Sequence, residues 1–156
     1  MTNTDYALKK EETDYLLLKD FNSFLGLKSL DKCPEKHTTD ASGYTQDGKY
    51  INIELKQRDI SINTYSSLYI EAHKVGDMLL DYVLEDKIPL YVNFLKDGYV
   101  VVFNLAKLKH RPNKIAKRIW SELYQGFELA KREELKLEDA YIYKKENNQY
   151  KLIHKP

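Results

Sequence analysis

The stretch YINIELK, Tyr50–Lys56, alternates apolar and polar side chains with a period of two residues. This alternation is typical of a β-strand, in which successive side chains point to opposite faces of a sheet. The strand places Ile51, Ile53 and Leu55 on one face and Asn52, Glu54 and Lys56 on the other. A carboxylate and an ammonium therefore lie side by side on a strand whose opposite face is apolar.

The Asp47-Gly48 pair before this strand predicts a β-hairpin whose other arm is residues 37–45. With a two-residue turn, Asp40 would lie opposite Leu55, on the wrong face for a shared site. With a three-residue loop over 46–48, Asp40 lies directly opposite Glu54. We favour the second register because Gly48 adopts the left-handed backbone conformation of that loop at little cost.

Two carboxylates on neighbouring strands repel each other unless a cation lies between them. Mg²⁺, or Mn²⁺, suits such a pair of Asp40 and Glu54 because it prefers oxygen ligands and binds substrate phosphates. Lys56 would then position or deprotonate a water and stabilise charge on a phosphate. The alternative interpretation makes Glu54 and Lys56 solvent-facing residues and Asp40 a polar residue near a turn.

The rest of the chain predicts a single domain, residues 1–156, because no repeat or linker interrupts it. Apolar periodicity predicts helices over 5–25, 66–84 and 113–130, with Leu123 on the apolar stripe of the last, and strand pairs over 89–95 with 99–105 and 140–145 with 149–154. This order predicts an α/β (α+β) fold with a central mixed β-sheet flanked by helices.

The order of a helix, Asp40, a hairpin, Glu54-Leu55-Lys56, a helix and a strand pair resembles the PD-(D/E)xK nuclease superfamily, over roughly residues 6–105. The resemblance implies a restriction endonuclease-like or Holliday junction resolvase-like fold and metal-dependent cleavage of DNA or RNA. It also implies that Asp40 and Glu54 are metal ligands and that Lys56 is the catalytic lysine. Thr39 stands where the family motif has proline.

Two further sets of residues follow from the resemblance. Members of the superfamily often carry an acid on the first helix, which here is Glu11 or Glu12. They also tend to place a Lys or Gln on the helix after the Glu-x-Lys strand, a position that Lys74 occupies. We therefore expect Glu11 or Glu12 to assist catalysis, and Lys74 to contact nucleic acid. Arg58, two residues after Lys56, is a candidate phosphate contact.

The charges balance over the whole chain, with 25 Lys and Arg against 24 Asp and Glu. This balance argues against a protein that coats nucleic acid nonspecifically, because that affinity needs many cations. One segment, 105–121, carries six cations and no acid: Lys107, Lys109, Arg111, Lys114, Lys117 and Arg118. It predicts a nucleic-acid-binding patch, although a solvated helix face explains it equally well.

The single cysteine, Cys33, cannot pair within the chain, and the longest apolar run, residues 99–103, is far shorter than a membrane span. We therefore expect a cytoplasmic protein without a membrane segment. The leading hypothesis is a Mg²⁺-dependent nuclease that acts on DNA, with a homodimer favoured if both strands are cut. The alternative is a catalytically inactive module of the same fold that binds nucleic acid or a protein partner.

Overall fold

The computed structural model describes residues 2–34, 37, 39–121 and 125–156. Its helices are α1 (Asn3–Leu25) and α2 (Ala72–Glu85), and a short 3₁₀ helix, η1, spans Leu137–Asp139. The strands are β1 (Ser29–Lys32), β2 (Ala41–Tyr44), β3 (Tyr50–Arg58), β4 (Ser67–Glu71), β5 (Ile88–Leu95), β6 (Tyr99–Asn104), β7 (Asn113–Ser121), β8 (Gly126–Lys136), β9 (Tyr141–Glu146) and β10 (Gln149–His154).

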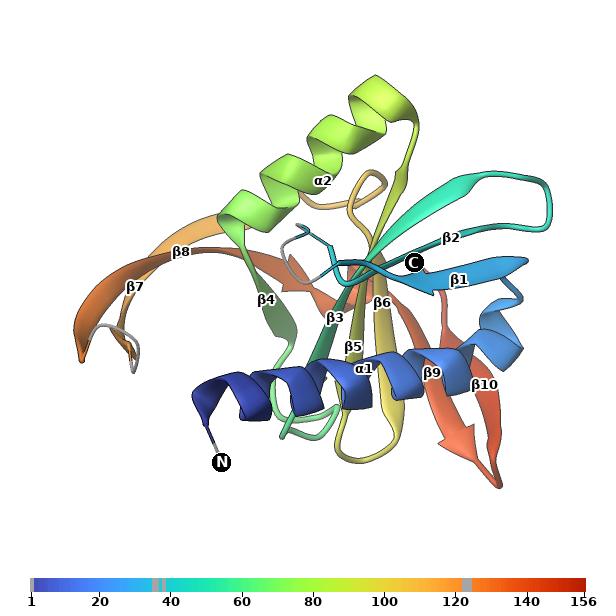
Figure 1. Ribbon diagram of the computed structural model, residues 1–156, viewed down its shortest axis with the longest axis horizontal. Coiled ribbons are helices and arrows are strands. Elements are labelled where there is room, and N and C mark those ends of the chain that lie inside the picture. The colour runs from blue at the N-terminus through green and yellow to red at the C-terminus, as the bar shows by residue number, and fades with distance from the viewer. Residues whose placement is uncertain (1, 35–36, 38, 122–124) are drawn as a thin grey trace.

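Seven strands form a mixed sheet in the order β1-β2-β3-β5-β6-β9-β10. Only β3 and β5 run parallel; the other neighbouring strands of this sheet are antiparallel. The chain passes from β3 to β5 through β4 and α2, a crossover of the kind that parallel neighbours require. In Figure 1, α1 crosses β3, β5 and β6 in the lower half of the view, and α2 lies at the top. The predicted mixed sheet flanked by helices is confirmed.

The two faces of the sheet bury separate apolar clusters. Leu18 and Phe21 of α1 pack with the inward side chains of β3, among them Ile53, and these three are fully buried. On the opposite face, Val75 and Met78 of α2 pack with residues of β5 and β6 and with apolar side chains of β4 and β8. Because the side chains of β5 and β6 alternate between these clusters, both faces of these two strands are covered.

The hairpin of β2 and β3 has the register that places Asp40 next to Glu54. Ala41 pairs with Ile53 and Tyr44 pairs with Tyr50, whose rings meet edge to face at 4.9 Å. Gly48 has a φ of 83°, the left-handed conformation that the three-residue loop requires. The predicted register is therefore confirmed.

A second sheet, in the order β4-β8-β7, corrects two predictions. The predicted helix over 113–130 is a hairpin of β7 and β8, and residues 122–124, with Leu123, lie outside the described residues. The predicted helix over 66–84 begins only at Ala72, after β4. Ile115 and Ile119 satisfy both a helical and a strand period, and the pairing of β8 with β4 selects the strand.

Among the described residues, neither helix combines the length and the apolarity needed to cross a membrane. The longer helix, α1, is capped at both ends. Thr2 and Asp5 form a reciprocal capping box at its start, and Gly26 ends it with a φ of 69°. Leu18 and Phe21 pack the helix against the sheet.

Candidate active site

Glu54 lies at the middle of β3, on the face of the sheet that α2 covers, and only 4% of its surface is exposed. Its Oε1 atom accepts a hydrogen bond from the Lys74 ammonium on α2. Its Oε2 atom is buried and has no hydrogen-bond partner among the described residues. An ionised carboxylate in this position needs further positive charge, because burial of an unsatisfied anion is costly.

Asp40 leaves the β2 ladder just before Ala41 and turns its side chain back onto β3. Its backbone N–H donates to the Ile53 carbonyl at 3.0 Å. Its Oδ2 atom accepts a hydrogen bond from the backbone N–H of Leu55 at 2.8 Å. Since Leu55 lies between Glu54 and Lys56 in the chain, this bond holds the Asp40 carboxylate beside the Glu-x-Lys stretch of the strand.

The nearby Asp40 carboxylate affects the pKa of Glu54. Burial and, to a smaller extent, the negative charge of Asp40 raise the pKa of Glu54 to about 7, against the opposing effect of Lys74. The charge of Asp40 therefore disfavours the ionised form of Glu54. A divalent cation fits this donor set, because it would relieve the repulsion and satisfy the unpartnered Oε2 atom.

Two lysines near these carboxylates have pKa values that are shifted in opposite directions. Lys56 reaches the surface, but neighbouring atoms remove water around its ammonium, and this desolvation, together with the charges of Lys10 and Arg58, lowers its pKa. Burial alone would lower the pKa of Lys74 as well, yet the hydrogen bond and the charge of Glu54 raise it overall. Lys56 is therefore the lysine better suited to exchanging a proton, and Lys74 the one that stays charged.

The acids of α1 differ in their position relative to Asp40. Glu11 lines a small hollow together with Asp40 and Leu55, whereas Glu12 is exposed and is absent from that lining. Asp14 lines the same hollow and was missed at the level of sequence, although its spacing of three residues from Glu11 places both on one helix side. Burial raises the pKa of Asp14, the charge of Asp40 adds to this, and a 2.6 Å hydrogen bond from Gln57 opposes it.

Arg58 and the predicted basic segment have different surroundings. The Arg58 guanidinium donates to the Asn93 side chain at 2.8 Å and to the Tyr91 hydroxyl at 2.6 Å. The cations at 107, 109, 111, 114, 117 and 118 are exposed, in the loop after β6 and on β7. On a helix, Lys114, Lys117 and Arg118 would share a side, but strand β7 turns Lys117 to the opposite face.

Within the described ranges, no group of three or more His, Cys, Asp or Glu side chains has a geometry ready to hold a metal ion. Asp40 and Glu54 face separate small hollows, one bounded by α1 and the other by α2 and β4. The structure thus brings together the acids at 40 and 54 and the lysines at 56 and 74, with Glu11 and Asp14 on the α1 side. It does not bring the predicted basic segment into this cluster.

No protein-family model matches the chain, and no curated protein matches its sequence. The structure is similar to that of Hjc from Archaeoglobus fulgidus, a Holliday junction resolvase from an archaeal hyperthermophile. The two share 16% sequence identity and a TM-score of 0.50, and the match covers 82% of each chain. The chain therefore shares the fold of this resolvase, and the predicted restriction endonuclease-like fold is confirmed.

Proposed function

We propose that this chain is a metal-dependent nuclease that hydrolyses phosphodiester bonds in DNA. The observation that carries the proposal is the carboxylate pair: the charge of Asp40 raises the pKa of the buried Glu54, and Glu54 keeps one buried oxygen without a partner among the described residues. Such a pair is stable in its ionised form only beside added positive charge. The fold shared with a Holliday junction resolvase supports a nucleic-acid substrate.

In this proposal Asp40 and Glu54 hold Mg²⁺ or Mn²⁺, which when bound supplies positive charge that stabilises a phosphate under attack. Lys56, with its lowered pKa, takes a proton from the attacking water or gives one to the leaving oxygen. Lys74 fixes the rotamer of Glu54 through its ion pair. Glu11 and Asp14, in the hollow of Asp40, orient water on the α1 side.

The β7–β8 hairpin supplies the DNA contact in this proposal. Its distal half extends away from the main sheet (Figure 1). Trp120 and Phe127 pair across the strands, both rings are at least half exposed, and the Arg118 guanidinium lies 4.6 Å from the Phe127 ring centroid. Exposed aromatic rings beside cations suit stacking on bases and contact with phosphates. Further phosphate contacts come from Lys107, Lys109, Arg111, Lys114 and Lys117.

A second candidate function is a catalytically inactive module that binds nucleic acid or a protein partner. One observation favours it: Lys74 already engages Glu54, and the described residues contain no cluster of three ligands around the pair. In that case the lysine replaces the cation, and the exposed cations of the β7–β8 hairpin carry the function. A homodimer is required by neither candidate, although cutting both strands of a duplex favours one.

The test is a cleavage assay with supercoiled plasmid, single-stranded DNA, a four-way junction and RNA, each with Mg²⁺, Mn²⁺ or EDTA. We expect metal-dependent cutting of DNA that disappears in Glu54→Gln and persists in Glu85→Gln, an exposed acid at the end of α2. Cutting of RNA alone would correct the substrate. Retained DNA binding without any cutting would favour the inactive module.

A further inference from the structure

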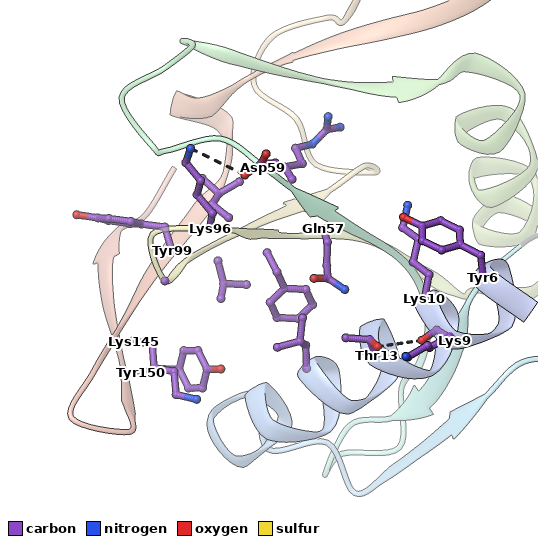
Figure 2. A pocket seen from close by; sticks show the side chains of 16 residues that line it. Tyr6, Lys9, Lys10, Thr13, Gln57, Asp59, Lys96, Tyr99, Lys145 and Tyr150 are labelled. Carbon is purple, nitrogen blue, oxygen red and sulfur yellow. Dashed lines mark hydrogen bonds and ion pairs between the residues drawn. The ribbon is translucent and has the colours of Figure 1, made fainter. Parts of the chain in front are cut away.

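One cavity among the described residues is distinct from the two hollows that hold the carboxylates. It has a volume of about 630 Å³ and lies between the N-terminal half of α1, the ends of β3 and β5, and the β9–β10 hairpin (Figure 2). This volume falls within the roughly 300–1,000 Å³ of sites that take small organic groups.

The floor of the cavity is apolar, whereas its rim carries aromatic rings. Leu17, Phe94 and Val100 contribute the apolar surface. Figure 2 shows Tyr6 on the α1 side and Tyr150 on the side of the β9–β10 hairpin. A flat, partly aromatic surface of this kind suits a planar ring system, such as a nucleobase, that stacks or packs by its face.

The charge of the lining is strongly positive. Five cations line the cavity against one carboxylate, Asp59. Lys96 lies 3.9 Å from Asp59, and Lys145 is paired with Asp20 at 2.7 Å. Lys9 and Lys10, on α1, have no carboxylate within ion-pair distance in the described part of the chain. An anionic group beside the planar ring would therefore be attracted chiefly to the α1 rim.

The cavity adjoins the carboxylate pair through two consecutive residues of β3. Gln57 lines the cavity and donates a hydrogen bond to Asp14, which shares a hollow with Asp40. Arg58 lines the cavity and also the hollow of Glu54 and Lys56. A strand whose phosphate lies at the carboxylates would thus have its neighbouring nucleotide at the mouth of the cavity.

We propose that this cavity binds one unpaired nucleotide of the substrate strand, with the base on the floor around Phe94 and the adjoining phosphates on Lys9 and Lys10. The proposal rests on the proposed nuclease function and names its substrate class: nucleic acid with a single-stranded segment next to the cleaved bond, as in a flap, a tail or an open branch. A base within an intact duplex cannot reach the floor, because its faces are covered by stacked neighbours.

The test measures binding by fluorescence anisotropy in EDTA, so that no cleavage is needed. The probes are a single strand, a blunt duplex of the same sequence, and that duplex with a single-stranded tail. The variants are Lys9→Ala/Lys10→Ala, which removes the rim cations, and Thr13→Phe, which fills the cavity from α1. Lys151→Ala/Lys155→Ala, which removes two exposed lysines outside the cavity, is the matched control.

We expect the rim variant to weaken the tailed and single-stranded probes, and to reduce the slope of log K against log salt by about 1.4, two phosphate contacts at roughly 0.7 each. Thr13→Phe should weaken the same two probes. The blunt duplex and the control variant should be unchanged. Equal weakening of the tailed and blunt probes would overturn the proposal, because it would show a general electrostatic surface.

Competition by free dAMP that displaces the tailed probe at matched nucleotide concentration would also overturn it, since the cavity would then belong to a free nucleotide. The outcomes for the cavity and for the nuclease are separable. A protein that cuts no substrate but shows the tail-specific losses in EDTA contradicts only the nuclease. If the protein cuts DNA, but its rim variant binds and cuts the tailed duplex and the blunt duplex equally well, only the cavity proposal is contradicted.

Discussion

The centre of β3 and the β7–β8 hairpin both carry charged residues, but in opposite environments. At β3, Glu54 is buried between the sheet and α2, and its pKa is raised to about 7. On the hairpin, Lys114 and Arg118 are exposed on the face that also carries Trp120. The difference teaches that burial ties a charge to its neighbours and makes it suited to chemistry, whereas exposure leaves it free to meet a partner.

The largest expected effect is on the rate of DNA cleavage, which should fall in variants of β3 and not in variants of the hairpin. Glu54→Gln or Asp40→Asn should lower the rate of DNA cleavage at saturating DNA on the order of 10³-fold, because a metal-ion site contributes several kcal/mol of charge stabilisation. Lys114→Ala/Arg118→Ala should weaken DNA binding but leave turnover within about threefold, since uniform binding affects KM rather than kcat. Single-turnover kinetics measure both. A hairpin variant that lowers turnover as much as Glu54→Gln would break the comparison.

The next largest effect is on the free energy of unfolding, which should fall more in a variant of β3 than in a variant of the hairpin. Ile53 is fully buried under α1, and Ile53→Ala should lower the free energy of unfolding by about 2–5 kcal/mol, because the cavity left behind does not close. Leu129 on β8 is 65% exposed, and Leu129→Ala should lower the free energy of unfolding by no more than about 0.5 kcal/mol. Urea unfolding followed by circular dichroism gives both values. A large loss for Leu129→Ala would place this face of the hairpin inside an interface, such as that of a homodimer.

The main sheet could be predicted because its signals are local. Tyr50–Lys56 has a strict period of two, and Gly48 determines the loop and hence the register that brings Asp40 to Glu54. The β7–β8 hairpin could not be predicted in the same way. Ile115 and Ile119 fit both a helix stripe and one strand face, and only the pairing with β4, distant in the sequence, decides between them.

The sequence predicted Asp40, Glu54 and Lys56 as members of the candidate site, but it did not predict the surroundings of these residues. That α2 covers Asn52 and Glu54 is a tertiary fact, so the sequence could not distinguish a buried carboxylate from a solvent-facing one. Asp14 was missed because the side of α1 that faces Asp40 depends on how the helix crosses the sheet. The ion pair of Lys74 with Glu54 likewise depends on the approach of α2 to β3.

The buried charge at β3 also predicts how stability changes with pH in the metal-free protein. Because the folded-state pKa of Glu54, about 7, lies above its ordinary value of 4.5, the folded state binds the proton more tightly. This contribution is fully present below pH 4.5 and is lost as the pH rises to 7. At 1.36 kcal/mol per pKa unit it amounts to about 3 kcal/mol.

Urea unfolding at pH 5 and pH 8 measures this change, with Glu54→Gln as the comparison because its amide does not titrate in this range. We expect the difference in the free energy of unfolding between the two pH values to be smaller in the variant. Added Mg²⁺ should restore stability at pH 8 in the unmodified protein only, since a ligand of the folded state stabilises it. The same pH dependence in both proteins would show that Glu54 is not the titrating group.

The smallest effect tests the exposed rings of the hairpin. Trp120→Ala should weaken DNA binding about tenfold, because stacking of a base on an aromatic ring contributes about 1–3 kcal/mol. Trp120→Phe keeps a ring for stacking and should retain most of the affinity. Trp120→Phe should lower the free energy of unfolding less than Trp120→Ala does, because half of the Trp120 surface is buried and the alanine gives up more of it. Leu152→Ala, an exposed apolar residue on β10, is the control and should bind normally. Loss of affinity in Trp120→Phe equal to that in Trp120→Ala would argue against stacking and leave the cations as the only DNA contacts of the hairpin.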